Sequence, residues 1–146
     1  MIVANQVCTF FLDTQMYGVA VESVQEVIRY QHMTDVPLAP TSVVGLINLR
    51  GQIVTAIDLR RRLGIQDRPT EQLPMNVVVR GEDGAISFLV DQIGDVQQID
   101  QANLEPLPDT LEGVSRDMLS GAYKMKDRLL LILDTERAMN VTSPSD

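Results

Sequence analysis

Short apolar runs separated by polar and turn-forming residues follow one another along most of the chain. They cover residues 7–12, 16–21, 42–49, 52–57, 75–79, 85–90, 121–125 and 128–133. Runs of this length, rich in Val, Ile, Leu and Phe, are typical of strands rather than of long helices. Asp83-Gly84, between two of the runs, is a strong two-residue hairpin signal because glycine tolerates positive φ. The pattern predicts an all-β protein.

Helix signals are confined to short segments. Asp58 begins one candidate that ends before Gly64, and Asp134 begins another that stops at Asn140. An aspartate accepts hydrogen bonds from the free amides of a helix start, while glycine and asparagine suit its end. We expect a helix of about one turn at each place. The pattern at residues 22–28 is also compatible with one helical turn or more.

A repeat is visible within the chain. Gly45–Gly64 aligns without gaps on Gly121–Asn140, and upstream Val19–Val27 matches Phe88–Val96 at a different offset. Short apolar strands resemble one another by coincidence, which is the alternative explanation. The matches keep their order and include glycine and aspartate positions, which favours a duplication.

The repeat predicts a single domain over residues 1–146, built from pseudo-repeat units at about 7–64 and 75–140. Five short strands in each unit suit a small closed barrel, which removes exposed sheet edges. Each barrel alone has a thin core, so the two are expected to pack together, with a groove between them as the natural ligand or peptide site. Whether the two units exchange strands is left open.

Composition and net charge exclude some classes of binding partner. The chain has 146 residues, 45% of them apolar, and a net charge of −8. This negative charge disfavours binding to nucleic acid or to a bare anionic membrane surface. The basic run at residues 60–62 is interpreted as a solvated helix face rather than an anion site. No apolar stretch is long enough to span a membrane, and the N-terminus lacks a basic segment and a cleavage site. We expect a cytoplasmic protein.

Reactive side chains are scarce. Cys8 lies in an apolar run and is interpreted as a small core residue, and His32 lies in a polar loop and is interpreted as a surface residue. One cysteine and one histidine cannot make a standard zinc site. No nucleotide-binding, calcium-binding or nucleophile-elbow motif occurs in the sequence.

Two acidic pairs, Glu22/Glu26 and Asp91/Asp95, have a spacing of four residues. Two carboxylates can do acid–base work or hold a metal, but no cluster of further ligands surrounds them in the sequence. They are interpreted as surface or partner-facing groups. We therefore expect no enzyme activity, cofactor or metal.

Longer segments carry a family resemblance. They are residues 17–21, 24–28, 44–54, 57–60, 90–96 and 129–133, and the most specific combination is Val-Gln-Glu-Val-Ile followed by Asn-Leu-Arg-Gly. The sequence resembles the CheW family of chemotaxis coupling proteins. The resemblance implies two packed five-stranded SH3-like barrels with a few short helices, and a role without catalysis.

As partners, the resemblance implies the cytoplasmic tip of a methyl-accepting chemotaxis receptor and the regulatory domain of a CheA-type histidine kinase. The protein would then be cytoplasmic and recruited to membrane-associated receptor arrays. The alternative is a CheW-like competitor or capping module in a pilus or other chemosensory pathway.

The resemblance also carries site residues onto this chain. Kinase binding falls on Val24, Glu26 and Gly45; receptor binding falls on Arg50, Ile53, Ile86, Ile93 and Val96; the family motif adds Asn48, Leu49 and Gly51. We expect Glu26 and Arg50 to pair, and an exposed salt bridge of little energetic value is the alternative. For the four apolar receptor positions the alternative is core packing, and for Gly45 a close backbone approach competes with a turn.

Overall fold

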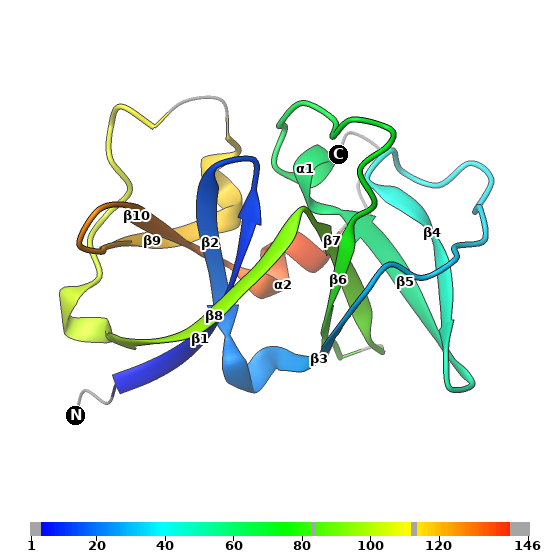
Figure 1. Ribbon diagram of the computed structural model, residues 1–146, viewed down its shortest axis with the longest axis horizontal. Coiled ribbons are helices and arrows are strands. Elements are labelled where there is room, and N and C mark those ends of the chain that lie inside the picture. The colour runs from blue at the N-terminus through cyan, green and yellow to red at the C-terminus, as the bar shows by residue number, and fades with distance from the viewer. Residues whose placement is uncertain (1–3, 83, 112–113, 141–146) are drawn as a thin grey trace.

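The computed structural model of the protein describes residues 4–82, 84–111 and 114–140. Ten strands dominate these residues, and the few helices are short (Figure 1). The strands are β1 (Ala4–Leu12), β2 (Gln15–Ala20), β3 (Val24–Ile28), β4 (Val43–Leu49), β5 (Gln52–Asp58), β6 (Met75–Val79), β7 (Ile86–Val90), β8 (Gln92–Asp100), β9 (Leu119–Lys124) and β10 (Leu129–Leu133). The helices are η1 (Val21–Ser23), α1 (Leu59–Arg62), η2 (Gln101–Asn103), η3 (Arg116–Met118) and α2 (Thr135–Met139). The all-β prediction is confirmed.

The strands form two five-stranded sheets. The first, sheet A, has the order β8-β1-β2-β10-β9, and the second, sheet B, has the order β3-β6-β7-β5-β4. Each sheet contains one parallel pair, β2 with β10 in sheet A and β5 with β7 in sheet B; the other pairs are antiparallel. Figure 1 shows sheet A on the left and sheet B on the right.

The two sheets have the same topology. When β1 to β5 are matched in order with β6 to β10, the order of sheet B becomes the order of sheet A. Strands β1 and β2 nevertheless lie in a sheet with β8, β9 and β10, whereas β6 and β7 lie with β3, β4 and β5. Strands from both predicted units therefore meet in each sheet.

One apolar core is shared by both sheets. Phe10 and Tyr17 of sheet A stack with ring centroids 6.0 Å apart, in the same buried cluster as Ile57 and Phe88 of sheet B. Burying each such side chain contributes about 1.5–3 kcal/mol, so this cluster stabilises the packing of one sheet on the other. Cys8 packs half-buried against the cluster, and burial raises the pKa of its thiol, in agreement with its interpretation as a small core residue.

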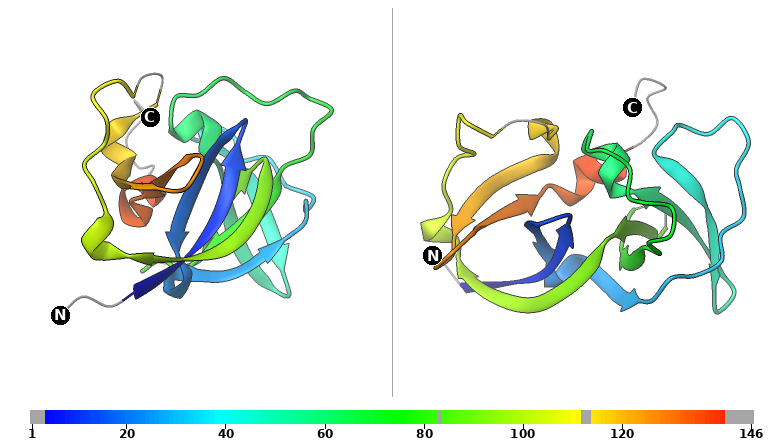
Figure 2. Two further views of the ribbon diagram at one scale, coloured as in Figure 1. Left: turned by 60° about the vertical axis from the view of Figure 1, so that its left-hand side comes forward. Right: turned by 45° about the horizontal axis from the view of Figure 1, so that its top comes forward.

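The predicted caps are confirmed. Asp58 accepts a hydrogen bond from the amide of Arg60 at the start of α1, and Gly64 follows α1 with a φ of 77°. Asp134 accepts from the amide of Arg137 at the start of α2. Figure 2 shows the two helices side by side between the sheets, where Arg62 of α1 donates to carbonyl oxygens at the end of α2.

Three local expectations need correction. Residues 22–28 do not form a longer helix: one 3₁₀ turn at Val21–Ser23 leads directly into β3. The β6–β7 hairpin forms, but its connection spans residues 80–85 rather than two, and Asp83 lies outside the described residues. Strand β8 was not among the expected strands because its partly exposed, glutamine-rich sequence lacks an apolar run.

The interpretation of residues 60–62 as a solvated face is wrong for Arg60, and that of Asp91 as a surface group is wrong too. Both side chains are buried and form an ion pair, because α1 packs against β7 and turns Arg60 toward the end of that strand. Arg61 does lie at the surface, where its Nε is 3.1 Å from Oδ1 of Asp67.

Among the described residues, no helix is both long and apolar enough to span a bilayer. No group of three or more His, Cys, Asp or Glu side chains in that part of the chain is placed to hold a metal ion.

Candidate partner-binding surface

The Asn-Leu-Arg-Gly motif forms the tight turn between β4 and β5. Arg50 and Gly51 are the two central residues, with φ values of 51° and 87°, as in the type I′ turns that suit twisted hairpins. The side chain of Asn48 accepts a hydrogen bond of 2.9 Å from the amide of Gly51, and Leu49 is buried beneath the turn. The motif thus builds a rigid tip that exposes 73% of the Arg50 side chain.

Arg50 pairs with Glu26, as expected. Its Nη2 donates to Oε2 of Glu26, and this hydrogen bond holds the pKa of the carboxyl below its usual range. Glu26 lies on β3, one edge strand of sheet B, whereas the Arg50 turn connects β5 to β4, the opposite edge strand. Sheet B is therefore curled enough for its two edges to meet. Nε2 of Gln25 lies 3.4 Å from Oε1 of Gln52 across the same junction.

The other two predicted kinase-binding positions are partly structural. Val24 is half-buried and packs against the shared core. Gly45 lies inside β4, so the turn alternative is wrong, and a Cβ there would be only 2.7 Å from the carbonyl oxygen of Thr34. Thr34 exchanges two backbone hydrogen bonds with Leu46, of 2.9 and 2.8 Å. Gly45 is thus needed for a close backbone approach within the chain itself.

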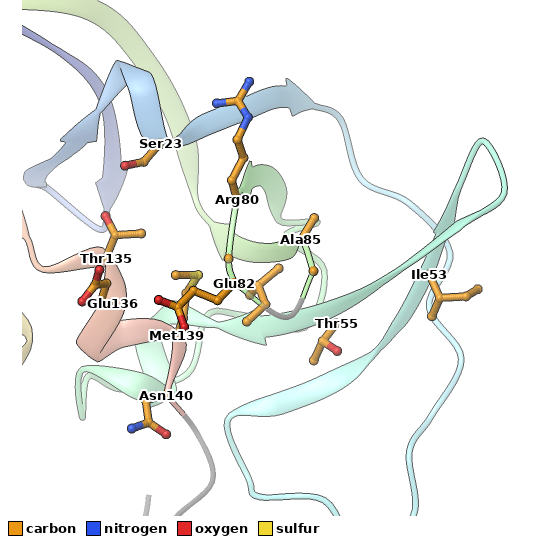
Figure 3. A pocket seen from close by; sticks show the side chains of 13 residues that line it. Ser23, Ile53, Thr55, Arg80, Glu82, Ala85, Thr135, Glu136, Met139 and Asn140 are labelled. Atoms are coloured by element: carbon orange, nitrogen blue, oxygen red, sulfur yellow. The ribbon is translucent and has the colours of Figure 1, made fainter.

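A cleft of about 660 Å³ lies between sheet B and α2, and it brings together Ile53 and Ile86 of the predicted receptor-binding set. Figure 3 shows the α2 residues Thr135, Glu136 and Met139 on one side and Ile53 of β5 on the other. The full lining is Ser23, Ile53, Thr55, Arg80, Gly81, Glu82, Gly84, Ala85, Ile86, Thr135, Glu136, Met139 and Asn140. The cleft is more polar than the predicted groove.

Ile93 and Val96 do not line this cleft. Both lie on β8 in sheet A, where Ile93 packs against the shared core and Val96 is 55% exposed. The core-packing alternative therefore applies to Ile93. Among the apolar receptor positions, Ile53 is the most open to a partner, at 59% exposure.

No pattern in the sequence pointed to α2 as part of the site. Thr135, Glu136 and Met139 reach the cleft because β10 of sheet A ends beside sheet B. That placement depends on how the two sheets pack, although the repeat of the one-turn helix, visible in the sequence, marks α2 as the counterpart of α1.

The family model described as CheW-like domain matches residues 6–143. The chain belongs to the CheW family. It is 31% identical over 134 residues to the chemotaxis protein CheW of Thermotoga maritima, covering 90% of this chain and 85% of the relative. It is 26% identical over 136 residues to the chemotaxis protein CheW of Treponema pallidum, covering 90% of this chain and 80% of the relative.

Among solved structures, the scaffolding protein TtCheW of Thermoanaerobacter tengcongensis superposes with a TM-score of 0.84 at 27% identity, covering 96% of this chain and 95% of that one. The likeness extends over both sheets. This CheW-family chain is accordingly a non-enzymatic scaffold protein of chemotaxis.

Proposed function

We propose that this chain couples methyl-accepting chemoreceptors to a CheA-type histidine kinase. The observation that carries the proposal is the juxtaposition of two different surfaces on sheet B. One is the exposed Glu26–Arg50 pair on a rigid turn, and the other is the cleft that contains Ile53 and Ile86. An adaptor needs two contact surfaces on one body, and here the Arg50 turn leads directly into β5, the strand that carries Ile53.

The first surface is assigned to the regulatory domain of the kinase. Its centre is Glu26 on β3, with Val24 on the same strand and Gly45 on β4. Paired charges at a rim contribute more to orientation and association rate than to affinity. The surface suits a modest, reversible contact, as expected for a component of an array.

The cleft is assigned to the receptor tip. A helical hairpin tip presents an apolar stripe, and the cleft offers it the apolar side chains of exposed Ile53, Ile86 and Met139. Arg50 lies one short turn from Ile53 along the chain, which places it at the boundary between the receptor and kinase surfaces. Val96 on β8 is a separate exposed apolar position in the proposed receptor surface.

Binding to receptors places the chain in the cytoplasm at membrane-associated arrays. The net charge of −8 supports recruitment through proteins rather than through nucleic acid or anionic lipid. A competitor or capping module of a pilus pathway is the alternative, since the same surfaces would serve it.

Reconstituted receptor-dependent autophosphorylation of a CheA-type kinase tests the proposal. Increasing amounts of the wild-type chain are expected to raise kinase activity, and Ile53→Asp is expected to abolish the rise while leaving binding to the isolated kinase domain unchanged. Leu73→Asp is the matched control, because Leu73 is 61% exposed and lies outside the cleft. A fall in kinase activity with the wild-type chain would instead identify a capping module.

A further inference from the structure

Arg80 contacts three consecutive backbone carbonyl groups at the crossing from sheet A to sheet B. Its amide donates to the carbonyl of Ser23 at 2.9 Å. Its Nη1 donates to the carbonyls of Glu22 and Val24, at 2.8 and 2.9 Å. One residue directly after β6 thus holds the last two residues of the η1 turn and the first residue of β3.

Strand β3 is irregular next to this contact. In the pairing of β3 with β6, Val24 lies opposite Val79 but Glu26 lies opposite Val78, so Gln25 is an extra residue. Bulges of this kind turn a strand and redirect the side chains that follow. The residue that follows is Glu26, whose carboxylate must reach Arg50 across the ends of sheet B.

We propose that Arg80 is a positioning residue for the Glu26–Arg50 pair. By fixing the carbonyls of Glu22 and Val24 immediately before the bulge, it sets the direction in which Glu26 leaves β3. A guanidinium suits this task because its nitrogens donate in a fixed planar geometry. The consequence for kinase binding rests on the proposed function.

The Arg80 contact also borders the cleft, which Ser23 and Arg80 line together with Ile53. In Figure 3 the guanidinium of Arg80 points toward β3 and away from Glu82. Arg80 therefore acts on the strand that carries Glu26 rather than by pairing with the carboxylate of Glu82.

The test compares Arg80→Ala and Arg80→Lys with Arg116→Ala. Arg116 is a matched control, since its guanidinium likewise donates to backbone carbonyls, those of Leu107, Pro108 and Leu111, but outside sheet B. The first readout is the pKa of the Glu26 carboxyl, followed by NMR during a pH titration. It should rise toward its ordinary range in Arg80→Ala, rise less in Arg80→Lys, and remain at the wild-type value in Arg116→Ala.

The second readout is affinity for the isolated kinase regulatory domain, measured where every variant is fully folded. Arg80→Ala should weaken binding by roughly tenfold and Arg80→Lys by less, because strand β3, no longer held by the arginine, must then be ordered when the kinase domain binds. An unmoved Glu26 pKa in Arg80→Ala overturns the positioning role, whatever the affinity does. A moved pKa with wild-type affinity supports the positioning role and instead counts against the kinase surface of the proposed function.

Discussion

Arg60 donates two hydrogen bonds to the carboxylate of Asp91, from Nε to Oδ1 at 3.0 Å and from Nη2 to Oδ2 at 2.5 Å. Nε of Arg68 donates to Oδ1 at 3.1 Å, and the amide of Asp13 donates to Oδ2 at 2.6 Å. Asp91 lies between β7 of sheet B and β8 of sheet A, whereas Asp13 lies in the turn between β1 and β2. A buried carboxylate therefore ties the two sheets together where the chain crosses between them.

Removal of this carboxylate should be strongly destabilising. Asp91→Ala leaves the guanidinium groups of Arg60 and Arg68 buried without their shared partner, and breaking such a pair costs about 3–5 kcal/mol. Asp95→Ala, at an exposed position of β8, should change the free energy of unfolding by less than about 0.5 kcal/mol. Urea denaturation of the two variants measures the difference. Equal effects would mean that the ion pairs do not stabilise the crossing.

The same carboxylate predicts a pH dependence. Burial raises the pKa of Asp91, but the hydrogen bonds from Arg60, the Asp13 amide and Arg68 outweigh burial and hold it below its usual range. A pKa lower in the folded than in the unfolded chain adds stability above the unfolded value, near 3.9, and this stability is lost as pH falls through the folded value. The stability gap between wild type and Asp91→Asn should therefore be full at pH 6 and shrink only below about pH 4. A gap that stays constant down to pH 2 would contradict this.

The Arg50 turn predicts opposite effects on stability and on coupling. Arg50 has a φ of 51°, a left-handed conformation that costs a residue with a side chain about 1 kcal/mol and costs glycine little. Its ion pair with Glu26 lies at the surface, where solvent screens the two charges, and should contribute little to the free energy of unfolding. Arg50→Gly should thus fold at least as stably as Arg50→Ala, by thermal unfolding, although both lose receptor-dependent kinase activation. If either variant couples fully at wild-type abundance, Arg50 is not part of the contact surface.

Features that are determined by residues close together in the chain could be predicted from the sequence, whereas features that join residues far apart in the chain could not. The caps of α1 are set by neighbouring residues, so Asp58 and Gly64 were sufficient to predict them. Arg60 and Asp91 are 31 positions apart, and which of three adjacent arginines turns inward depends on how α1 packs. No local pattern carries that information.

The candidate site divides in the same way. The pairing of Glu26 with Arg50 was expected from the family resemblance, and the structure contains it. The grouping of Ile93 with Ile53 in one receptor site stays a prediction: β8 and β5 lie in different sheets, and Ile93 does not line the cleft that contains Ile53. Strand exchange between the two units decides that placement, and it is a property of long-range pairing that residue spacing does not reveal.

Gly45 and Gly121 occupy equivalent positions in the two units and admit the same kind of contact. A Cβ at Gly45 would be 2.7 Å from the carbonyl oxygen of Thr34, and one at Gly121 would be 3.1 Å from that of Glu105. Both carbonyls belong to isolated two-residue bridges that cover the outer side of β4 and β9.

Alanine at these glycines should therefore destabilise the chain unequally. Overpacking a well-packed site costs about 1–3 kcal/mol, and Gly45→Ala should fall at the upper end because its clash is with backbone at shorter range, while Gly121→Ala should fall at the lower end. Urea denaturation gives the ranking, and amide exchange at Thr34 and Leu46 shows whether their bridge has opened. Because the backbone contact is internal, any loss of kinase binding in Gly45→Ala should accompany faster exchange at that bridge. Lost binding with the bridge still protected would instead make Gly45 a point of direct contact with the kinase.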